Sequence, residues 1–512
     1  MPDLLIVRRD TYFDSVTLML ASRDAEEVAG VSFAAAVTAT PVNVDLLEAQ
    51  GFDPSSQNLG PNDLVVAVRA DDEGAASAAR QAIDARLAHT GDAGSSERAG
   101  IAARSFRSVV RASPGASIAF ISVPGGFATA EVADALEAGL NVFCFSDGPS
   151  LEDEALLKQR ALERGLLVMG ADCGTAIIDG VGLGFANAVT RGSLGIVGAS
   201  GTGIQEVTCL LDSAGVGISH ALGVGGRDLS RVVGGAMTLR ALELLDADDS
   251  TEAIVVISKP PDAEVAARVV TSAGRASKPV VIGFLGMDGP QMEAPANVTL
   301  ARSLEVAAER GARLVGGALE PALPLPEQRT PGFVRGLFCG GSLCYEAMLV
   351  LAEGGRAIAS NVPLKPEWRL AEVATSVADT FIDFGEDELT EGRAHPMIDP
   401  SLRNERLERE AQDPTVGAIV LDVVLGYGAH PDPAADLARV ISRARDGRGD
   451  DLTIAVALCG ASGDPQDVAA QAAQLSAAGA FVTRNSAHAA RVCAKAVSDE
   501  RSSQRSRQDK NA

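Results

Sequence analysis

Short apolar runs alternate with amphipathic, helix-length stretches along most of the chain. The apolar runs that we expect to form the strands of two related sheets lie at residues 194–197, 253–256, 280–284, 336–338, 418–421 and 454–458. Parallel neighbours need a crossover, for which a helix is the usual choice, so this alternation predicts parallel α/β sheets. Because the last three runs repeat the arrangement of the first three, we predict a duplicated α/β domain.

The first strand of each set leads through a Gly-rich turn into a helix. The turns read Ser-Gly-Thr-Gly-Ile-Gln-Glu at residues 200–206 and Gly-Gly-Ser-Leu-Cys-Tyr-Glu at residues 340–346. A helix N-terminus attracts anions through its unpaired N–H groups, and glycine lets the ligand approach the backbone. The matched pair therefore favours a phosphate site, although glycine alone also permits a tight turn. The candidate phosphate-binding residues are Ser200, Gly201, Thr202, Gly203, Gly340, Gly341 and Ser342.

The same alternation of strand and helix patterns predicts the domains of the rest of the chain. Residues 1–100 alternate strand and helix patterns and end in a Gly- and Ser-rich linker, which predicts a small N-terminal α/β module. Residues 101–191 repeat the β-α-β pattern and predict a Rossmann-like domain. We expect the two flavodoxin-like repeats to span residues 192–320 and 333–497, and the polar residues 498–512 to form a disordered tail.

Composition narrows the choice of partners. The formal net charge of −24 provides no general attraction to nucleic acid or anionic lipid, so we expect neither as a partner. No apolar run is long enough to span a bilayer and no signal architecture precedes the first strand, which predicts a cytoplasmic protein. The seven cysteines form no CxxC pair, so we expect neither a disulfide framework nor a metal site.

Positive side chains follow two predicted strands of the first repeat. Gly226 and Arg227 come after one strand, and Lys259 comes after the next. Ligands of open α/β sheets bind at this end of the strands. Arg227 and Lys259 would then supply the local positive charge that an acidic protein needs in order to bind a phosphate, although exposed loops explain either residue equally well.

Two histidines of the second repeat are candidates for acid–base catalysis. His395 is preceded by Arg393 and flanked by carboxylates, and His430 lies just past a predicted strand. An imidazole suits proton transfer because its ordinary pKa is close to neutral pH. The alternative for each histidine is an exposed loop position without a catalytic role. His395, His430 and Lys259 are the candidate catalytic residues, and Gly226, Arg227 and Arg393 are the candidate substrate-binding residues.

Five motifs resemble the FdrA family. They lie at residues 168–175, 198–206, 225–230, 395–400 and 421–424, and include Gly-Gly-Arg-Asp-Leu-Ser and His-Pro-Met-Ile-Asp-Pro. The resemblance extends over nearly the whole chain. FdrA proteins look like succinyl-CoA synthetase with the ligase domains of its α and β subunits fused, and without the ATP-grasp domain. The resemblance therefore implies a degenerate CoA-binding-type domain followed by two CoA-ligase-like domains.

The sequence also departs from the synthetase pattern. The phosphorylated histidine of the synthetase is expected soon after the strand at residues 280–284, yet residues 285–300 contain no histidine. The carboxylate that steadies that histidine falls near Lys259, which carries the opposite charge. The Gly-rich start of the CoA-binding domain is also missing before residue 117. The comparison implies that a phosphohistidine relay is lost while the paired phosphate site remains.

The resemblance implies a function as well. FdrA proteins are associated with purine and allantoin breakdown, as a component of an oxamate carbamoyltransferase that acts with partner proteins. The implied ligand is phosphate or an acyl or carbamoyl phosphate. One alternative is an NDP-forming acyl-CoA synthetase similar to succinate–CoA ligase, which would bind CoA. The other alternative is a non-catalytic scaffold that binds a ligand while its partners do the chemistry.

Overall fold

A computed structural model describes residues 2–11, 13–60, 63–92, 105–287, 293–327 and 330–498. The chain divides into two compact units. The first unit holds Met1–Ile101 and Phe384–Leu402, and the second holds Ala102–Asp383 and Arg403–Ala512. We describe each unit by itself.

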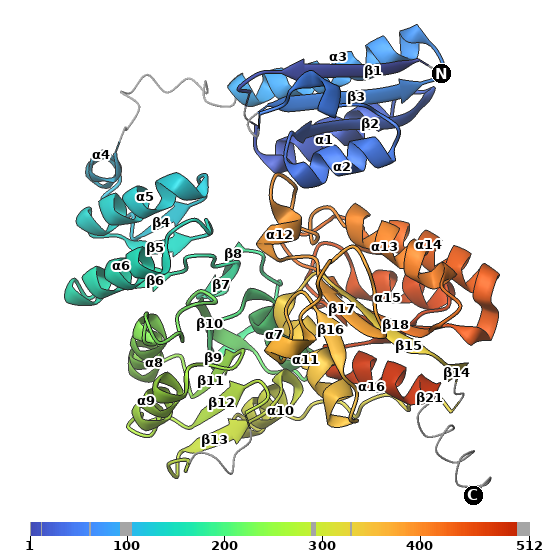
Figure 1. Cartoon of the computed structure of the whole chain (residues 1–512). Coiled ribbons are helices and arrows are strands. Elements are labelled where there is room, and N and C mark those ends of the chain that lie inside the picture. The colour runs from blue at the N-terminus through green and yellow to red at the C-terminus, as the bar shows by residue number, and fades with distance from the viewer. Residues whose placement is uncertain are drawn as a thin grey trace, which may run out of the picture. The chain divides into compact units, whose positions relative to one another are not determined.

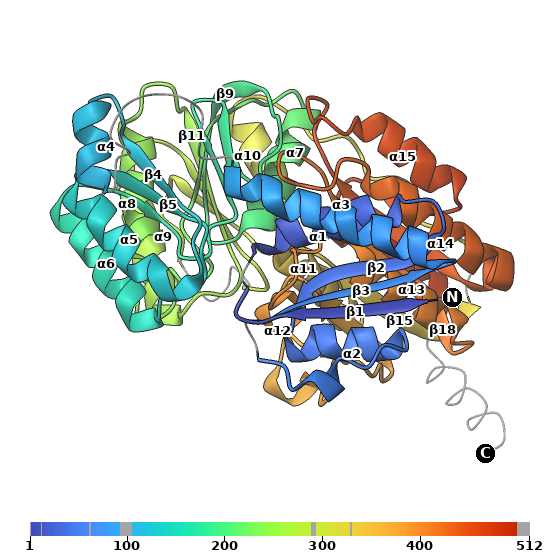
Figure 2. The same cartoon turned by 90° about the horizontal axis from the view of Figure 1, so that it is seen from above.

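The first unit is built on a three-stranded antiparallel sheet. Its strands β1 (Asp3–Arg8), β2 (Val31–Thr38) and β3 (Leu64–Ala70) lie in the order β1-β3-β2. The helices of this unit are α1 (Ser15–Glu26), α2 (Pro41–Ala49), the 3-10 turn η1 (Ser55–Gln57), α3 (Glu73–Asp92) and α12 (Asp387–Thr390). Apolar side chains of α1 and α3 pack on one face of the sheet and those of α2 pack on the other, so the predicted small α/β module is present (Figure 2).

The borders of this unit differ from those expected from the sequence. Helix α3 continues into the expected linker at residues 90–100, of which residues 93–100 lie outside the described part. Residues 384–402, expected in the second repeat, fold with the first unit. There the side chain of Asn43 donates a hydrogen bond to the carbonyl of Gly392 over 3.0 Å, and Thr40 donates one to the carbonyl of Glu391 over 3.4 Å. Such a long-range contact leaves no periodic pattern in the sequence.

The second unit begins with a three-stranded parallel sheet in the order β4-β5-β6. Its elements are α4 (Phe106–Ala112), β4 (Ile118–Ile121), α5 (Gly125–Glu137), β5 (Asn141–Cys144), α6 (Leu151–Glu163) and β6 (Val168–Met169). This β-α-β arrangement is the Rossmann-like pattern predicted for residues 101–191. Helix α5 begins at Gly125, directly after Pro124.

The first repeat forms a seven-stranded sheet in the order β13-β12-β11-β9-β10-β7-β8. Its strands are β7 (Thr175–Ile178), β8 (Val181–Gly184), β9 (Arg191–Gly198), β10 (Ile218–Gly223), β11 (Ala253–Ser258), β12 (Val280–Phe284) and β13 (Val298–Ala301). The helices are α7 (Gly201–Ser213), α8 (Ala236–Ala247), α9 (Ala263–Ala273) and α10 (Leu304–Leu314). The strands from β13 to β10 are parallel, as predicted, whereas β7 and β8 form an antiparallel hairpin at one edge.

The second repeat forms a six-stranded parallel sheet in the order β16-β17-β15-β18-β19-β20. Its strands are β15 (Phe333–Phe338), β16 (Ile358–Ser360), β17 (Asp379–Asp383), β18 (Val416–Val424), β19 (Thr453–Cys459) and β20 (Phe481–Thr483). The short strands β14 (Thr330–Pro331) and β21 (Val497–Ser498) pair beside it. The helices are α11 (Gly341–Glu353), η3 (Pro366–Trp368), α13 (Ser401–Gln412), α14 (Pro433–Arg448), η4 (Gly449–Asp451), α15 (Val468–Ala477) and α16 (Ser486–Ala496). Ser498 thus belongs to a strand, and the remainder of the expected tail lies outside the described residues.

The two repeats place corresponding strands at the same point of their sheets. Strand β9 lies between β11 and β10, and β15 lies between β18 and β17, so the strand order reverses at both. Open α/β sheets bind ligands at the carboxyl ends of strands at such a reversal. The helices that follow, α7 and α11, lie next to each other between the two large sheets (Figure 1).

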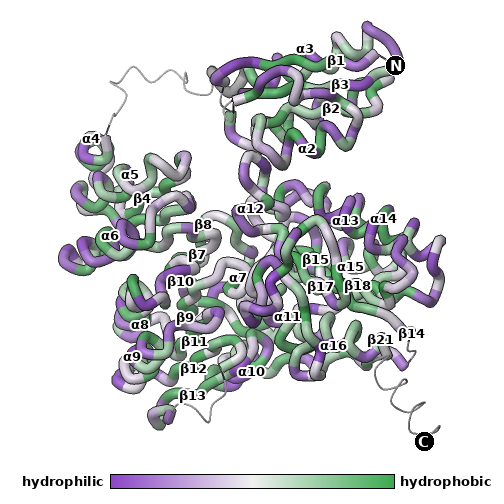
Figure 3. The backbone as a smooth tube through the Cα atoms, viewed as in Figure 1, coloured by the Kyte–Doolittle hydropathy of each residue, from purple (hydrophilic) through white to green (hydrophobic). Residues whose placement is uncertain are grey.

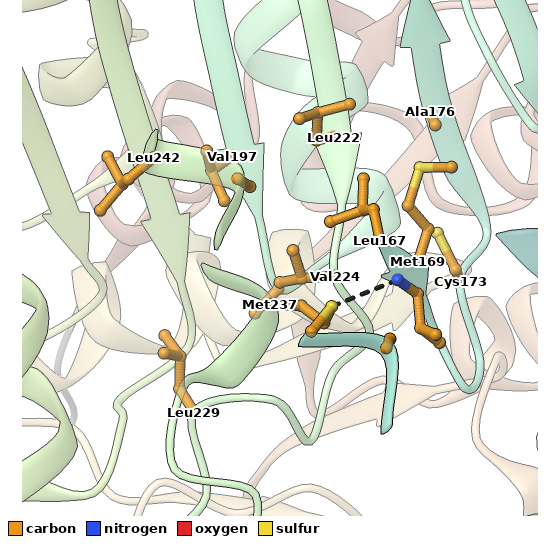
Figure 4. Packing of buried hydrophobic residues seen from close by; sticks show 14 of the residues in the cluster. Leu167, Met169, Cys173, Ala176, Val197, Leu222, Val224, Leu229, Met237 and Leu242 are labelled. Atoms are coloured by element: carbon orange, nitrogen blue, oxygen red, sulfur yellow. Dashed lines mark hydrogen bonds between the residues drawn. The ribbon is translucent and has the colours of Figure 1, made fainter. Parts of the chain in front are cut away.

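The hydrophobic core of the second unit crosses the predicted border at residue 191. One cluster of buried side chains runs from Ala119 in β4 to Val298 in β13. Met237 of α8 packs beside Leu167 and Val224, and its sulfur accepts a hydrogen bond from Val168 N over 3.2 Å (Figure 4). The strands of the large sheets are mostly hydrophobic, whereas α8 and α9 carry hydrophilic segments (Figure 3).

All seven cysteines are buried and free. Among the described residues, no helix is both long enough and apolar enough to cross a lipid bilayer.

Candidate functional site

The two Gly-rich turns meet each other in the second unit. Ser200 Oγ, just before α7, donates a hydrogen bond to Ser342 Oγ in the first turn of α11 over 2.6 Å. A Cβ added to Gly340 would lie 2.9 Å from the side chain of Thr202, so the backbone of one turn touches the side chain of the other. The sequence-predicted residues from both repeats therefore form one local arrangement, which we call the paired N-termini (residues 200–203 and 340–342).

Each turn is held by a different set of hydrogen bonds. Ser200 caps α7, with its Oγ accepting a hydrogen bond from Gly203 N over 3.0 Å. Gly340 has no side chain to cap α11. Instead, Cys339 N and Gly340 N donate to the two carboxylate oxygens of Asp422 over 2.7 and 2.8 Å. Burial raises the pKa of Asp422, and these two N–H groups and Arg403 counteract that shift.

Charged side chains lie beside the first residue of α11. A Cβ added to Gly341 would lie 2.5 Å from Asp383 Oδ2 and 2.9 Å from Lys259 Nζ. Lys259 follows β11 and is half-buried, whereas Asp383 ends β17 and is buried. A larger residue at position 341 would therefore displace one of these charged groups. Lys259, a predicted catalytic residue, lies beside the paired N-termini. Asp383 lies there as well, although the sequence analysis did not name it as a candidate.

A hydroxyl group lies beside the first residue of α7. A Cβ added to Gly201 would lie 3.2 Å from Thr175 Oγ1. Thr175 is buried, and its Oγ1 has no hydrogen-bond partner among the described residues. Sequence reasoning did not single out Thr175 as a site residue, because only the folded hairpin brings β7 to the start of α7.

Two glutamates at matching positions of the two turns meet behind the paired N-termini. Glu206 and Glu346 are both buried and hydrogen-bond to each other. Ser486, at the start of α16, donates its Oγ to both carboxyls and its backbone N to Glu206 over 3.0 Å. Burial and the nearby charge of Glu346 raise the pKa of Glu206 well above its usual range. Burial also raises the pKa of Glu346. Both shifts favour a proton on this pair in the folded protein.

Arg227 does not point to the paired N-termini. Its Nη2 lies 2.8 Å from Glu154 Oε2 and donates to the carbonyl of Pro149 over 2.8 Å. Lys158, fully buried, donates to Glu154 over 2.7 Å and to Asp228 over 2.9 Å. Arg227 and Asp228 of the Gly-Gly-Arg-Asp motif thus connect the loop after β10 to α6 through ion pairs, and Gly226 lies in the same loop.

His395 and Arg393 belong to the first unit and not to the paired N-termini. Burial lowers the pKa of His395 to about 4, so its imidazole is neutral at pH 7. Its Nδ1 accepts a hydrogen bond from Met397 N over 3.2 Å. Arg393 is half-buried, and its backbone N donates to the carbonyl of Thr390 over 3.0 Å. Their predicted roles stay predictions.

His430 lies in the second unit, in the loop that follows β18. Its Nδ1 accepts a hydrogen bond from Asp432 N over 3.1 Å, and its carbonyl accepts one from Gln466 Nε2 over 3.2 Å. These contacts hold the imidazole within its own loop, at the end of the sheet where β15 meets α11. A catalytic role for His430 also stays a prediction.

Three protein families match parts of the chain. The CoA-ligase family matches residues 337–497, and the CoA binding domain matches residues 190–286. Residues 1–102 match a family described as "AllF, heavy metal-associated domain". Soft metal ions favour thiolate ligands, yet none of the seven cysteines lies in this segment. No group of three or more His, Cys, Asp or Glu side chains suited to a metal occurs in the described residues, so these residues supply no site for such an ion.

Individual proteins resemble the chain over different lengths. It is 39% identical over 501 residues to the uncharacterized protein YahF of Escherichia coli K12, which covers 94% of this chain and 96% of YahF. It is 32% identical over 181 residues to alpha subunit 1 of the ADP-forming succinate–CoA ligase of Archaeoglobus fulgidus, which covers 34% of this chain and 60% of that subunit. A solved dinucleotide-forming acetyl-coenzyme A synthetase 1 of Ca. Korarchaeum cryptofilum aligns at 18% identity with a TM-score of 0.32, over 74% of this chain and 82% of that one.

Proposed function

Because the chain belongs to the FdrA-type family of succinyl-CoA-synthetase-like proteins, we propose that its paired N-termini bind phosphate or the phosphoryl group of an acyl or carbamoyl phosphate. The observation that carries the proposal is the direct contact of the two turns through Ser200 and Ser342. Two helix N-termini at one point present their free N–H groups and positive dipole ends to a single anion. This local attraction is needed in a chain with a net charge of −24.

Lys259 and Asp383 favour a carbamoyl phosphate over a simple acyl phosphate. The ammonium of Lys259 would neutralise a phosphoryl oxygen at the start of α11. A carboxylate beside it would repel an anion, but it can accept hydrogen bonds from the amide N–H groups of a carbamoyl group. An acyl phosphate with a hydrocarbon acyl group offers no such donors.

The reaction that fits these groups is phosphorolysis of oxalurate by an oxamate carbamoyltransferase, with this chain as one subunit beside partner proteins. A phosphate oxygen attacks the carbamoyl carbon of oxalurate, and the bond between that carbon and the oxamate nitrogen breaks. The nitrogen takes a proton, which gives oxamate and carbamoyl phosphate. This direct transfer needs no phosphohistidine, which agrees with the absence of histidine from residues 285–300.

A histidine would supply the proton of this reaction. His430, which lies in the second unit, would be the donor. Arg227 would act indirectly, by anchoring the loop that contains Gly226. A cytoplasmic location would suit such a catabolic enzyme.

The second candidate is an NDP-forming acyl-CoA synthetase that uses CoA as a substrate. It is favoured by the matches of the CoA-ligase family and of the CoA binding domain. The third candidate, a scaffold without catalysis, predicts ligand binding in this chain and unchanged activity of a complex after substitutions at Lys259. The three candidates are separated by ligand preference and by the effect of substitutions.

A thermal-shift experiment on the whole chain tests the binding site. The ligands are inorganic phosphate, carbamoyl phosphate, oxamate and CoA, and a ligand that binds the folded state raises Tm with concentration. In Gly341→Ala, the new methyl group would lie 2.5 Å from Asp383 Oδ2, so we expect the phosphate-dependent shift to be lost. Gly126→Ala is the matched control, because it lies in the first turn of α5 and its methyl group would meet nothing within 4 Å.

The outcomes discriminate between the candidates. A shift with phosphate and carbamoyl phosphate that Gly126→Ala keeps and Gly341→Ala loses supports the proposed site. A shift with CoA alone favours the acyl-CoA synthetase. Catalysis is then tested in a complex with co-expressed partners, where Lys259→Met should abolish formation of carbamoyl phosphate from oxalurate. A fully active Lys259→Met complex would leave only the scaffold role.

A further inference from the structure

Thr175 carries a buried hydroxyl group for which the described structure offers no hydrogen-bond partner. Only 1% of the residue is exposed, and its Oγ1 is unpaired within the described residues. Other buried threonines of the second unit are paired: Thr208 Oγ1 donates to the carbonyl of Gln205 over 2.9 Å, and Thr238 Oγ1 donates to Asp228 over 2.7 Å. Because leaving a buried hydroxyl unpaired is unfavourable, Thr175 points to a partner that arrives from outside the chain.

The backbone around Thr175 fixes where its hydroxyl lies. Thr175 is the first residue of β7 and pairs with Gly184 of β8. A Cβ added to Gly223 would lie 2.2 Å from the carbonyl oxygen of Thr175, so the strand is packed tightly against β10. A β-branched side chain has few rotamers, and the hydroxyl is therefore held in place before any ligand binds.

The hydroxyl faces the start of α7. From a Cβ placed on Gly201, Thr175 Oγ1 is 3.2 Å away, closer than the backbone N of Thr175 at 3.8 Å. Gly203 N is already bonded to Ser200 Oγ, whereas the N–H groups of Gly201 and Thr202 precede the first possible intrahelical bond. One hydroxyl and two N–H groups thus gather at this helix end.

We propose that Thr175 is a ligand-binding residue whose hydroxyl donates a hydrogen bond to a phosphoryl oxygen held at the N-terminus of α7. This inference rests on the proposed function and adds a residue and a selectivity to it. A phosphoryl group offers three terminal oxygens, enough for α7, for α11 and for the Thr175 hydroxyl. A carboxylate has only two, so the arrangement selects a phosphoryl group over a simple carboxylate such as oxamate.

Calorimetric titration of the whole chain with inorganic phosphate tests the inference. In Thr175→Val the side chain keeps its shape and loses the hydroxyl, and we expect phosphate to bind about tenfold to a hundredfold more weakly. Thr175→Ser keeps the hydroxyl and should bind within a few-fold of the wild type. Thr208→Val removes a buried hydroxyl of α7 that is already paired, and it should leave the affinity for phosphate unchanged.

Each failure has a distinct meaning. A wild-type chain that does not bind phosphate overturns the proposed function and this inference together. Equal affinity in the wild type and Thr175→Val overturns this inference alone. A loss shared by Thr175→Ser or Thr208→Val, with a lower Tm in the absence of phosphate, traces the effect to packing and also overturns it. Tighter binding of oxamate than of phosphate contradicts the selectivity.

Discussion

Replacing Glu206 by glutamine should stabilise the second unit by an amount that grows with pH. Glutamine has the shape of protonated Glu206 and can donate to Glu346 as the shared proton does. In the folded chain, burial and the charge of Glu346 raise the pKa of Glu206 well above its usual range. The folded state therefore keeps a proton that the unfolded chain releases. Wild-type stability is full below the unfolded pKa and falls as the pH rises toward the folded pKa.

The size of the effect follows from proton linkage. Each pH unit between the unfolded and folded pKa values of one carboxyl lowers the free energy of unfolding by about 1.4 kcal/mol. From pH 5 to pH 7 the wild type should lose about 2.7 kcal/mol through Glu206, provided that its unfolded pKa lies below and its folded pKa above this window. Glu206→Gln has no such proton to lose. Its stability relative to the wild type should increase by the same amount.

Urea denaturation at pH 5, 6 and 7 measures this difference. Trp368, the only tryptophan of the chain, lies in the second unit and reports its unfolding by fluorescence. Glu243→Gln is the matched control, since Glu243 lies on α8 with an exposed side chain. An infrared band of a protonated carboxylic acid at pH 7, present in the wild type and lost in Glu206→Gln, would identify the proton directly.

A stability difference between Glu206→Gln and the wild type that does not change with pH would contradict a proton shared by Glu206 and Glu346. It would mean that both carboxyls are ionised in the folded chain, and that Ser486 and the start of α16 fully compensate two buried charges. A strongly destabilised Glu206→Gln at every pH would equally contradict a shared proton.

Three further predictions follow from other parts of the structure. Lys158→Met should lower the free energy of unfolding by about 3–5 kcal/mol in urea denaturation monitored by circular dichroism, because it leaves the buried carboxylate of Asp228 without its ammonium partner and Glu154 dependent on its ion pair with Arg227. In NMR titrations, His395 should titrate near pH 4. Its contribution to the free energy of unfolding is then complete above the unfolded pKa of about 6.5 and is lost as the pH falls toward the folded pKa. Titration of His395 near pH 6.5 would contradict burial of the ring. Lys259→Met should weaken phosphate binding and reduce its dependence on salt, and an unchanged salt dependence would exclude Lys259 from the site.

Local patterns predicted three neighbouring interior strands in each of the two large sheets, β12-β11-β9 and β15-β18-β19. The apolar run at residues 280–284 coincides with β12, and the run at residues 194–197 lies within the longer β9. The hairpin of β7 and β8 was missed although its turn, Asp179-Gly180, is a strong hairpin signal and both residues have positive φ. Its strands are only four residues each, too short for a clear alternation.

The proposed phosphate site could be predicted only in part from the sequence. The repeated turns identified both helix N-termini, because glycine and the following helix recur at fixed spacing. The neighbours of each turn depend on tertiary packing: Thr175 arrives from the hairpin, Asp383 from the end of β17 and Lys259 from the end of β11. Arg227 was expected to bind the ligand because of its charge, but its side chain instead forms an ion pair with Glu154 on α6.

A crystal structure of the whole chain, grown or soaked with inorganic phosphate, would show directly whether the paired N-termini bind phosphate. We expect one phosphate at the paired N-termini, accepting hydrogen bonds from the backbone N–H groups of Gly201 and Gly341 and from the Thr175 hydroxyl, with Lys259 beside it. A structure at saturating phosphate in which these N–H groups are without the ion, or in which phosphate binds elsewhere in the second unit, would contradict the account.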